Sequence, residues 1–125
     1  MDKQTVSTPK APAAIGPYSQ AAGGGGILFV SGQLPLDPES GAMPADIRAQ
    51  TAQSMKNVMA IVEAGGSCAG KILKCCLYIR DMAQFSVINE VYASFFSSEP
   101  PARVVVEVSR LPKDALIEID AIALQ

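Results

Sequence analysis

The stretch that decides the fold is Pro100–Ala123, which reads PPARVVVEVSRLPKDALIEIDAIA. Two strand-like runs, Arg103–Val108 and Ala115–Ala123, lie on either side of a turn at Leu111–Asp114. In the second run apolar side chains alternate with mostly acidic ones, and this period of two predicts a strand with one apolar and one charged face. The short connection predicts that the two strands pair as a hairpin.

Two charged residues of this stretch are candidates for chemistry. Arg103 opens the first run and shares a strand face with Val105 and Glu107, whereas Glu118 lies midway along the second run. A fixed cation and a carboxylate near one end of a sheet can bind a small anion and activate a water molecule. The same two residues can also form an ordinary surface ion pair, which is the commoner arrangement for such side chains.

Length and composition predict a single domain over residues 1–125. Hydrophobic residues make up 49% of the chain, which suffices for a core. No apolar run approaches the ~20 residues that a membrane-spanning helix needs. The first residues carry no secretory apolar stretch, so we expect a soluble cytoplasmic protein, with an organellar location left open. The net charge of −2 argues against a dedicated nucleic-acid-binding protein, which would carry a basic patch.

The cysteine and histidine content narrows the chemistry. The sequence contains no histidine, and this removes the commonest general base and the commonest transition-metal ligand. Serine–histidine and cysteine–histidine catalysis within one chain are therefore excluded, and no metal site is expected. The three cysteines, Cys68, Cys75 and Cys76, fit a reduced compartment and are interpreted as small buried hydrophobic side chains rather than as a redox site.

The N-terminal third predicts a set of short strands. Thr5–Thr8 is a strand candidate, and the glycine tract Gly23–Gly26 predicts a hairpin turn before a buried strand over Ile27–Val30, which runs into Ser31–Pro35. A phosphate-binding loop would need a Lys-Ser or Lys-Thr pair and a following helix, which are missing here. Gly32, inside the strand pattern, predicts a bulge or the close approach of a ligand or another backbone.

Helical and strand patterns then alternate. The spacing of apolar residues predicts a helix over Asp46–Ala64, with Asp46 as its N-cap and Gly65–Gly66 as its end. A buried strand over Ile72–Ile79 and a second helix over Asp81–Ser97 follow. This order predicts an α+β sandwich in which a mixed six-stranded sheet is covered on one face by two helices.

The uncovered sheet face is expected to be apolar. The strand positions predicted to point there include Val105, Ile122 and Cys76, and such side chains are unfavourable in water. Burial of this face against identical subunits is the hypothesis that follows.

A series of motifs runs along the chain in a specific order. They are Gly16–Ala21 (GPYSQA), Ser31–Pro35 (SGQLP) with Asp37, Pro38 and Gly41, Asp81–Phe85 with Asn89–Tyr92 and Phe96, Pro101–Arg103, Glu107–Val108, Arg110–Lys113 and Ile117–Ile119. Together they closely resemble the RidA/YjgF family of reactive-intermediate (enamine/imine) deaminases over nearly the whole chain.

The resemblance implies a fold, an assembly and an activity. The fold is the chorismate-mutase-like (bacillus-type) α+β sandwich, and the assembly is a homotrimer with an inner β-barrel and sites between subunits. The activity is the hydrolysis of 2-imino acids, which are tautomers of 2-aminoacrylate and 2-aminocrotonate, to 2-keto acids and ammonia. Pyridoxal-phosphate dehydratases release these intermediates, and the reaction itself needs no metal, cofactor or covalent nucleophile.

The resemblance also assigns roles to residues. Arg103 matches the arginine that holds the substrate carboxylate, Glu118 matches the residue that positions the water, and Tyr18 matches the tyrosine of the site. The matched residues that line the cleft are Ser31, Gly32 and Asn89. For Tyr18, ordinary packing of a half-buried ring is the alternative interpretation.

The chain departs from the family pattern directly after the arginine. Many members carry a serine and often a cysteine there, whereas this chain has Val104 and Val105. The backbone amide of Val105 can still donate to a substrate carboxylate. The two valines make the predicted cleft more apolar and leave the preferred substrate open.

Two other classes of function remain as alternatives. One is a non-catalytic protein that binds 2-keto acids or related metabolites and regulates a partner. The other is an RNA-directed endoribonuclease or translation inhibitor, an activity attributed to this family, against which the acidic charge balance counts. A water-orienting carboxylate at Glu118 favours the deaminase, because binding alone would not require it.

Overall fold

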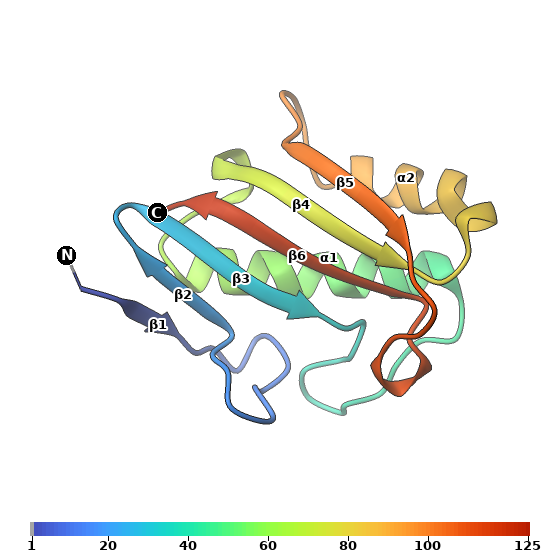
Figure 1. The fold of residues 1–125 in the computed structure, drawn as a ribbon, viewed down its shortest axis with the longest axis horizontal. Helices are drawn as coiled ribbons and strands as arrows, with labels where there is room; N and C mark the ends of the chain where they lie inside the picture. The colour runs from blue at the N-terminus through green and yellow to red at the C-terminus, as the bar shows by residue number, and fades with distance from the viewer. Residues whose placement is uncertain (1) are drawn as a thin grey trace.

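The computed structural model describes residues 2–125, which form one six-stranded sheet and two α-helices (Figure 1). The elements in chain order are β1 (Gln4–Val6), β2 (Ala21–Gly24), β3 (Ile27–Gln33), α1 (Ile47–Ala64), β4 (Ile72–Ile79), α2 (Phe85–Ala93), β5 (Ala102–Glu107) and β6 (Ile117–Leu124). Short 3₁₀ turns span Ala69–Lys71, Met82–Gln84 and Pro112–Asp114.

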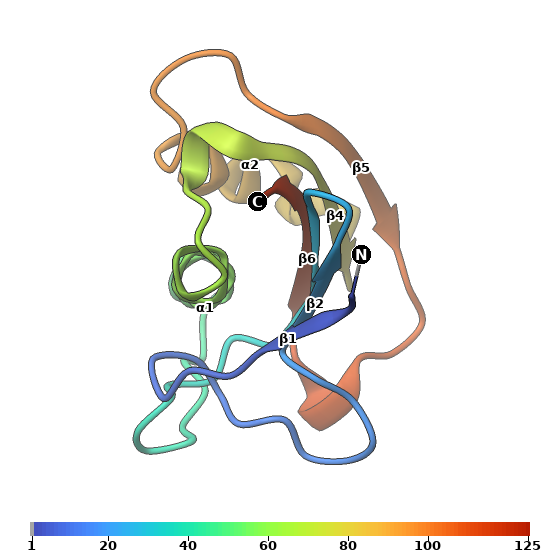
Figure 2. The ribbon, with the colours of Figure 1, turned by 90° about the vertical axis from the view of Figure 1, so that its left-hand side faces the viewer.

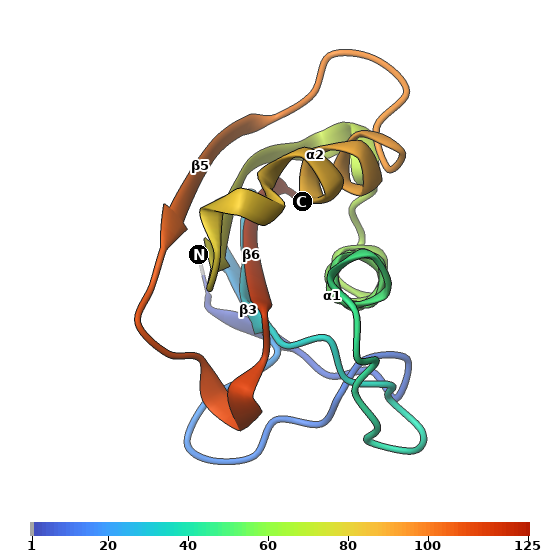
Figure 3. The same ribbon diagram turned by 90° about the vertical axis from the view of Figure 1, so that its right-hand side faces the viewer.

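The sheet is mixed, and its strand order is β1-β2-β3-β6-β4-β5. All neighbouring strands are antiparallel except β4 and β5, which are parallel. Both helices cover the same face of the sheet, as Figures 2 and 3 show from opposite sides. The predicted α+β sandwich with a mixed six-stranded sheet and two helices on one face is therefore confirmed.

The predicted hairpin between the last two strands is wrong. β5 pairs with β4 alone, and β6 lies between β3 and β4. The crossover from β4 through α2 returns to the sheet as a parallel neighbour, which places β5 at the edge. β6 buries every second side chain almost completely, which fits its central position over α1.

Helix α1 begins and ends where the sequence predicts. The Asp46 carboxylate accepts a hydrogen bond from the Ala49 amide at 2.8 Å, and the chain leaves the helix at Gly65. Its sheet-facing side buries Met55, Val58 and other apolar residues of the core. Each fully buried side chain of this kind contributes roughly 1.5–3 kcal/mol relative to an exposed one.

Helix α2 is shorter than the predicted Asp81–Ser97. At its start the Asp81 side chain caps a 3₁₀ turn by accepting from the Ala83 amide, so the α-helix begins only at Phe85. At its end the Ser94 hydroxyl donates to the Val91 carbonyl at 2.6 Å, which satisfies an end carbonyl of the helix.

The first strand is likewise shorter than predicted, because β1 ends at Val6. The glycine tract forms the predicted hairpin turn between β2 and β3. Gly25 and Gly26 have φ angles of 63° and 83°, the left-handed values that a tight two-residue hairpin turn requires.

The uncovered face of the sheet carries several apolar side chains. Those exposed there are Phe29 (54%), Val104 (41%), Val106 (39%) and Leu124 (44%). Ile122 and Cys76 also lie on this face, as predicted, and are half-buried.

Two predicted side-chain placements are wrong. Val105 does not lie on the uncovered face, because it is aligned with the buried Leu77 of β4 and packs against the helix-side core. Cys68 is not buried but exposed, because it precedes the 3₁₀ turn after α1.

Within residues 2–125, no helix is both long enough and apolar enough to cross a membrane.

Candidate functional site

The residues predicted to form a site are divided between two cavities. Arg103 and Asn89 line one of about 770 Å³ between α2 and the start of β5. The second, of about 630 Å³, lies beside β3 and the start of β6, and its walls include Tyr18, Ser31, Gly32 and Glu118.

Arg103 is held from three directions by α2. Its Nη1 donates to Oδ1 of Asn89 at 2.6 Å, and its guanidinium carbon lies 5.5 Å from the ring centre of Phe85 and 5.0 Å from that of Tyr92. Ring faces attract a guanidinium, and they restrict its orientation without neutralising its charge. The sequence placed Asn89 in the site, but it did not identify the two rings as neighbours of Arg103.

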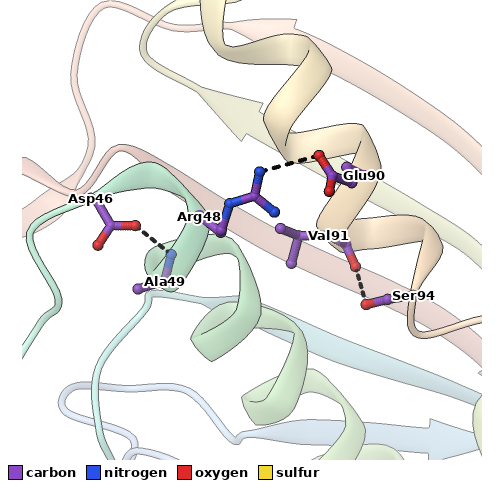
Figure 4. A network of polar contacts seen from close by, with 6 residues as sticks. All are labelled: Asp46, Arg48, Ala49, Glu90, Val91 and Ser94. Carbon is purple, nitrogen blue, oxygen red and sulfur yellow. Dashed lines mark hydrogen bonds and ion pairs between the residues drawn. The ribbon is translucent and has the colours of Figure 1, made fainter.

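Within residues 2–125, Arg103 has no carboxylate partner. The one ion pair among residues 2–125 joins Arg48 of α1 to Glu90 of α2 at 3.1 Å, and Figure 4 shows it on the exposed side of the helices. The alternative prediction of a surface ion pair between Arg103 and Glu118 is therefore wrong. A half-buried guanidinium without a counter-ion suits the binding of an anion from outside the chain.

Glu118 lies directly against Gly32. A Cβ atom added at Gly32 would come within 2.5 Å of Oε2 of Glu118 and 3.0 Å of its Cδ. The register of β3 against β6 shifts between Val30 and Gln33, which confirms the predicted irregularity at this glycine. The bulge that the sequence predicted is present, whereas the group that lies closest to Gly32 is a side chain rather than a ligand or another backbone.

Burial raises the pKa of the Glu118 carboxyl, and the negative charge of Asp120 raises it further. Both residues lie on the uncovered face of β6, two positions apart. A carboxylate with a raised pKa is a stronger base than an ordinary glutamate while it is ionised, and this property suits the acceptance of a proton.

Two hydrogen bonds from Ser31 attach the loop that carries Tyr18 to strand β3. The Ser31 hydroxyl donates to the Ser19 carbonyl at 2.6 Å, and the Ser31 amide donates to the Gln20 carbonyl at 2.9 Å. The Tyr18 side chain is 51% exposed, and its hydroxyl accepts from the Ile15 amide at 3.4 Å. Tyr18 therefore lines the cavity wall while about half of its surface stays exposed.

The two cavities open on opposite faces of the sheet. Arg103 is aligned with the buried Cys75 of β4 and faces the helices, whereas Glu118 is aligned with Tyr78 and faces the uncovered side. The two positions are also three residues apart along β4, which is about 10 Å. The prediction that they lie near one end of the sheet is wrong, and within one chain they do not meet.

Residues that sequence reasoning missed include Lys113, which lines the Glu118 cavity. It lies in the turn Pro112–Asp114 with a φ of 59°, and the only signal for it was its place in a family motif. Among residues 2–125, no three His, Cys, Asp or Glu side chains are grouped as ligands of a metal ion.

Comparison with known proteins gives consistent matches over nearly the full chain. Residues 8–125 match the family model described as Endoribonuclease L-PSP. The chain is 47% identical over 125 residues to the 2-iminobutanoate/2-iminopropanoate deaminase of Escherichia coli strain K12, with 98% of each chain covered. It is 51% identical over 122 residues to a RutC family protein of Pyrococcus horikoshii, with 97% of each covered.

Solved structures agree with this grouping. The crystal structure of the YjgF gene product of E. coli superposes with a TM-score of 0.95 at 47% identity, and that of E. coli TdcF with bound serine does so with a TM-score of 0.95 at 45% identity. Each comparison covers 98% of both chains. On these matches, the chain belongs to the RidA/YjgF family, the family that the Endoribonuclease L-PSP model describes.

Proposed function

We propose that this protein hydrolyses 2-imino acids, such as 2-iminobutanoate and 2-iminopropanoate, to 2-keto acids and ammonia. The observation that carries the proposal is the Arg103 guanidinium, which has no ion-pair partner within residues 2–125 and is held by Asn89 beside a cavity large enough for a small carboxylate. The 47% identity to a deaminase with this specificity supports it.

The chemistry follows from the charges. Arg103 binds the substrate carboxylate through two parallel N–H···O bonds, and the Val105 amide adds a donor. A water molecule attacks the imine carbon and gives a proton to Glu118, and the protonated Glu118 then passes this proton to the former imine nitrogen. The resulting amino alcohol then releases ammonia and leaves the keto group. Tyr18 packs against the substrate and offers its hydroxyl, and Ser31 and Gly32 line the cleft.

The proposal includes a homotrimer, in which Arg103 of one subunit and Glu118 of a neighbouring subunit face the same substrate. Its support is that the two residues lie on opposite faces of one chain, and that Phe29, Val104 and Val106 leave an apolar sheet face uncovered. We expect the imino acids to come from pyridoxal-phosphate enzymes, whose eliminations release enamines.

The test is a coupled assay in which threonine dehydratase produces the imine from threonine and semicarbazide traps it. We expect the wild-type protein to lower the trapped product and Arg103→Ala to abolish this effect. Arg48→Ala, which removes an exposed arginine already paired with Glu90, is the matched control. Light scattering should give three times the chain mass of 13.1 kDa.

A second candidate is binding of a small amino or keto acid without turnover. The crystal structure of the relative TdcF with bound serine favours it, because that ligand is a small carboxylate. An inactive wild-type protein that binds 2-ketobutanoate by calorimetry, with binding lost in Arg103→Ala, would select this candidate over the deaminase.

A further inference from the structure

A hydrogen-bonded pair lies beside Glu118 on the uncovered face of the sheet. The Tyr78 hydroxyl of β4 donates to Oδ2 of Asp120 on β6 at 3.0 Å. Asp120 is two residues from Glu118 on the same face of the strand, so the two Cα atoms are about 7 Å apart. None of the steps proposed above uses Tyr78 or Asp120.

The strand register places Tyr78 next to both carboxylates. Tyr78 is the direct cross-strand partner of Glu118, whereas Asp120 is the partner of Cys76. The Tyr78 side chain therefore stands opposite Glu118 and reaches diagonally to the next position of β6. The hydrogen bond from Tyr78 holds the Asp120 carboxylate beside Glu118, and the tyrosine hydroxyl donates to Asp120 rather than to Glu118.

Tyr78 and Cys76, the two titratable neighbours of Asp120 on β4, both stay protonated. Burial and the hydrogen bond to Asp120 raise the pKa of Tyr78 to about 12, so its hydroxyl remains a donor throughout the physiological range. Burial and the charge of Asp120 also raise the pKa of Cys76, which therefore remains a neutral thiol.

Asp120 is a negatively charged residue on the same strand face as Glu118. The Coulombic effect of Asp120 adds to burial in raising the pKa of the Glu118 carboxyl. On the β3 side Glu118 meets Gly32, which has no side chain. The titratable and charged groups that face Glu118 or share its cavity are Asp120 on β6, Tyr78 and Cys76 on β4, and Tyr18 and Lys113 in the cavity wall.

We propose that Asp120 and Tyr78 are positioning residues for Glu118. The charge of Asp120, which Tyr78 holds in place, makes the Glu118 carboxylate a stronger base toward the attacking water. The inference rests on the proposed function. It adds to that function a second carboxylate that does not touch the substrate but sets the proton affinity of the one that does. Tyr78 contributes by holding Asp120 in place.

Two measurements test the pair. The first is the pH profile of kcat/KM for imine hydrolysis in Asp120→Asn, Asp120→Glu and Tyr78→Phe. We expect Asp120→Asn to move the acidic limb to lower pH and to reduce kcat/KM at neutral pH about two- to fivefold, because a weaker base accepts the water proton less readily. Asp120→Glu should restore the profile, and Tyr78→Phe should shift it in the same direction as Asp120→Asn by a smaller amount.

The second measurement is the titration of the Glu118 carboxyl by ¹³C NMR in the substrate-free protein. We expect its midpoint to fall in Asp120→Asn and to return in Asp120→Glu. Glu63→Gln, which removes one exposed carboxylate from α1, is the matched control and should leave the midpoint unchanged. An unchanged midpoint in Asp120→Asn would overturn the inference, even if the rate fell.

The two proposals fail in different ways. If the wild-type protein has no deaminase activity, the proposed function is wrong, and the NMR titration still decides whether Asp120 acts on Glu118. If activity is present and the pH profile of Asp120→Asn overlays that of the wild type, the deaminase stands and the positioning role is wrong. If Asp120→Asn does not fold, Tyr78→Phe and Asp120→Glu provide the comparison.

Discussion

Arg103 and Glu118, which have opposite charges, line two cavities on opposite faces of the same sheet. On the helix side, Arg103 is oriented by two rings and by Asn89, and nothing in residues 2–125 neutralises it. On the uncovered side, Glu118 is placed against Gly32 and beside a like charge. Because the sheet separates Arg103 from Glu118, the two side chains do not form an ion pair that would neutralise both charges.

Under the proposed function, this difference means that a complete site combines surfaces of two subunits rather than one pocket of a single chain. The strongest test combines two inactive variants, Arg103→Ala and Glu118→Gln, co-expressed with different tags and purified through both. In a cyclic trimer each hybrid contains one interface with both residues intact, so activity should return to about one third of the wild-type value. Each variant alone should be inactive. A hybrid without activity would show that one chain supplies both residues.

The carboxylate half depends on the missing side chain at position 32. Gly32→Ala should displace the Glu118 carboxylate, since the added Cβ would meet Oε2 at 2.5 Å. A displacement of about 1 Å at a reacting group costs about 100-fold in rate. The atoms that must move are the end of a flexible side chain, so the loss of folding free energy should stay below about 1 kcal/mol. Steady-state kinetics and denaturant unfolding measure the two effects. A large loss of stability with unchanged kcat would contradict this placement.

The cationic half depends on Asn89. Asn89→Ala removes the amide oxygen that accepts from Arg103 at 2.6 Å, so KM should rise about tenfold while kcat changes little. Ser86→Ala, which also lines this cavity, is the control and should leave KM within a factor of two. A fall in kcat at constant KM would instead place Asn89 in the chemical step.

The smallest effect concerns stability against pH. The pKa of Glu118 is raised in the folded protein, so protonated Glu118 stabilises the fold. This contribution is lost as pH rises through the raised pKa. Glu118→Gln stays neutral, so its Tm should exceed that of the wild type at neutral pH. The two curves should converge below the ordinary glutamate value of 4.5. Calorimetry at one protein concentration measures this, with Glu63→Gln as a control. A lower Tm at neutral pH would contradict the assignment.

Local patterns predicted the elements well, because the signals lie within a few residues of each other. The cap at Asp46, the turn at Gly25–Gly26 and the alternation along β6 were all readable from the sequence. Strand order was not, since the same two strands at Pro100–Ala123 suit a hairpin or a central and an edge position equally well. The face of Val105 was missed for the same reason: alternation gives two faces but does not say which one meets the helices.

The site was predicted in its residues but not in its geometry. Arg103, Glu118 and Tyr18 came from motifs, and the structure places them in two cavities rather than one. The rings around Arg103 and the Tyr78–Asp120 bond depend on contacts between distant segments, which no local pattern encodes.

The position of β6 has a consequence for how the chain is made. The strand that comes last in the sequence lies between β3 and β4, so a nascent chain on the ribosome cannot close its sheet until residues 117–124 have emerged. Until then, β3 and β4 each expose an edge that is prone to aggregation. Glu118 arrives with the same strand, so a product of premature termination would lack the fold and the proposed water-activating carboxylate together.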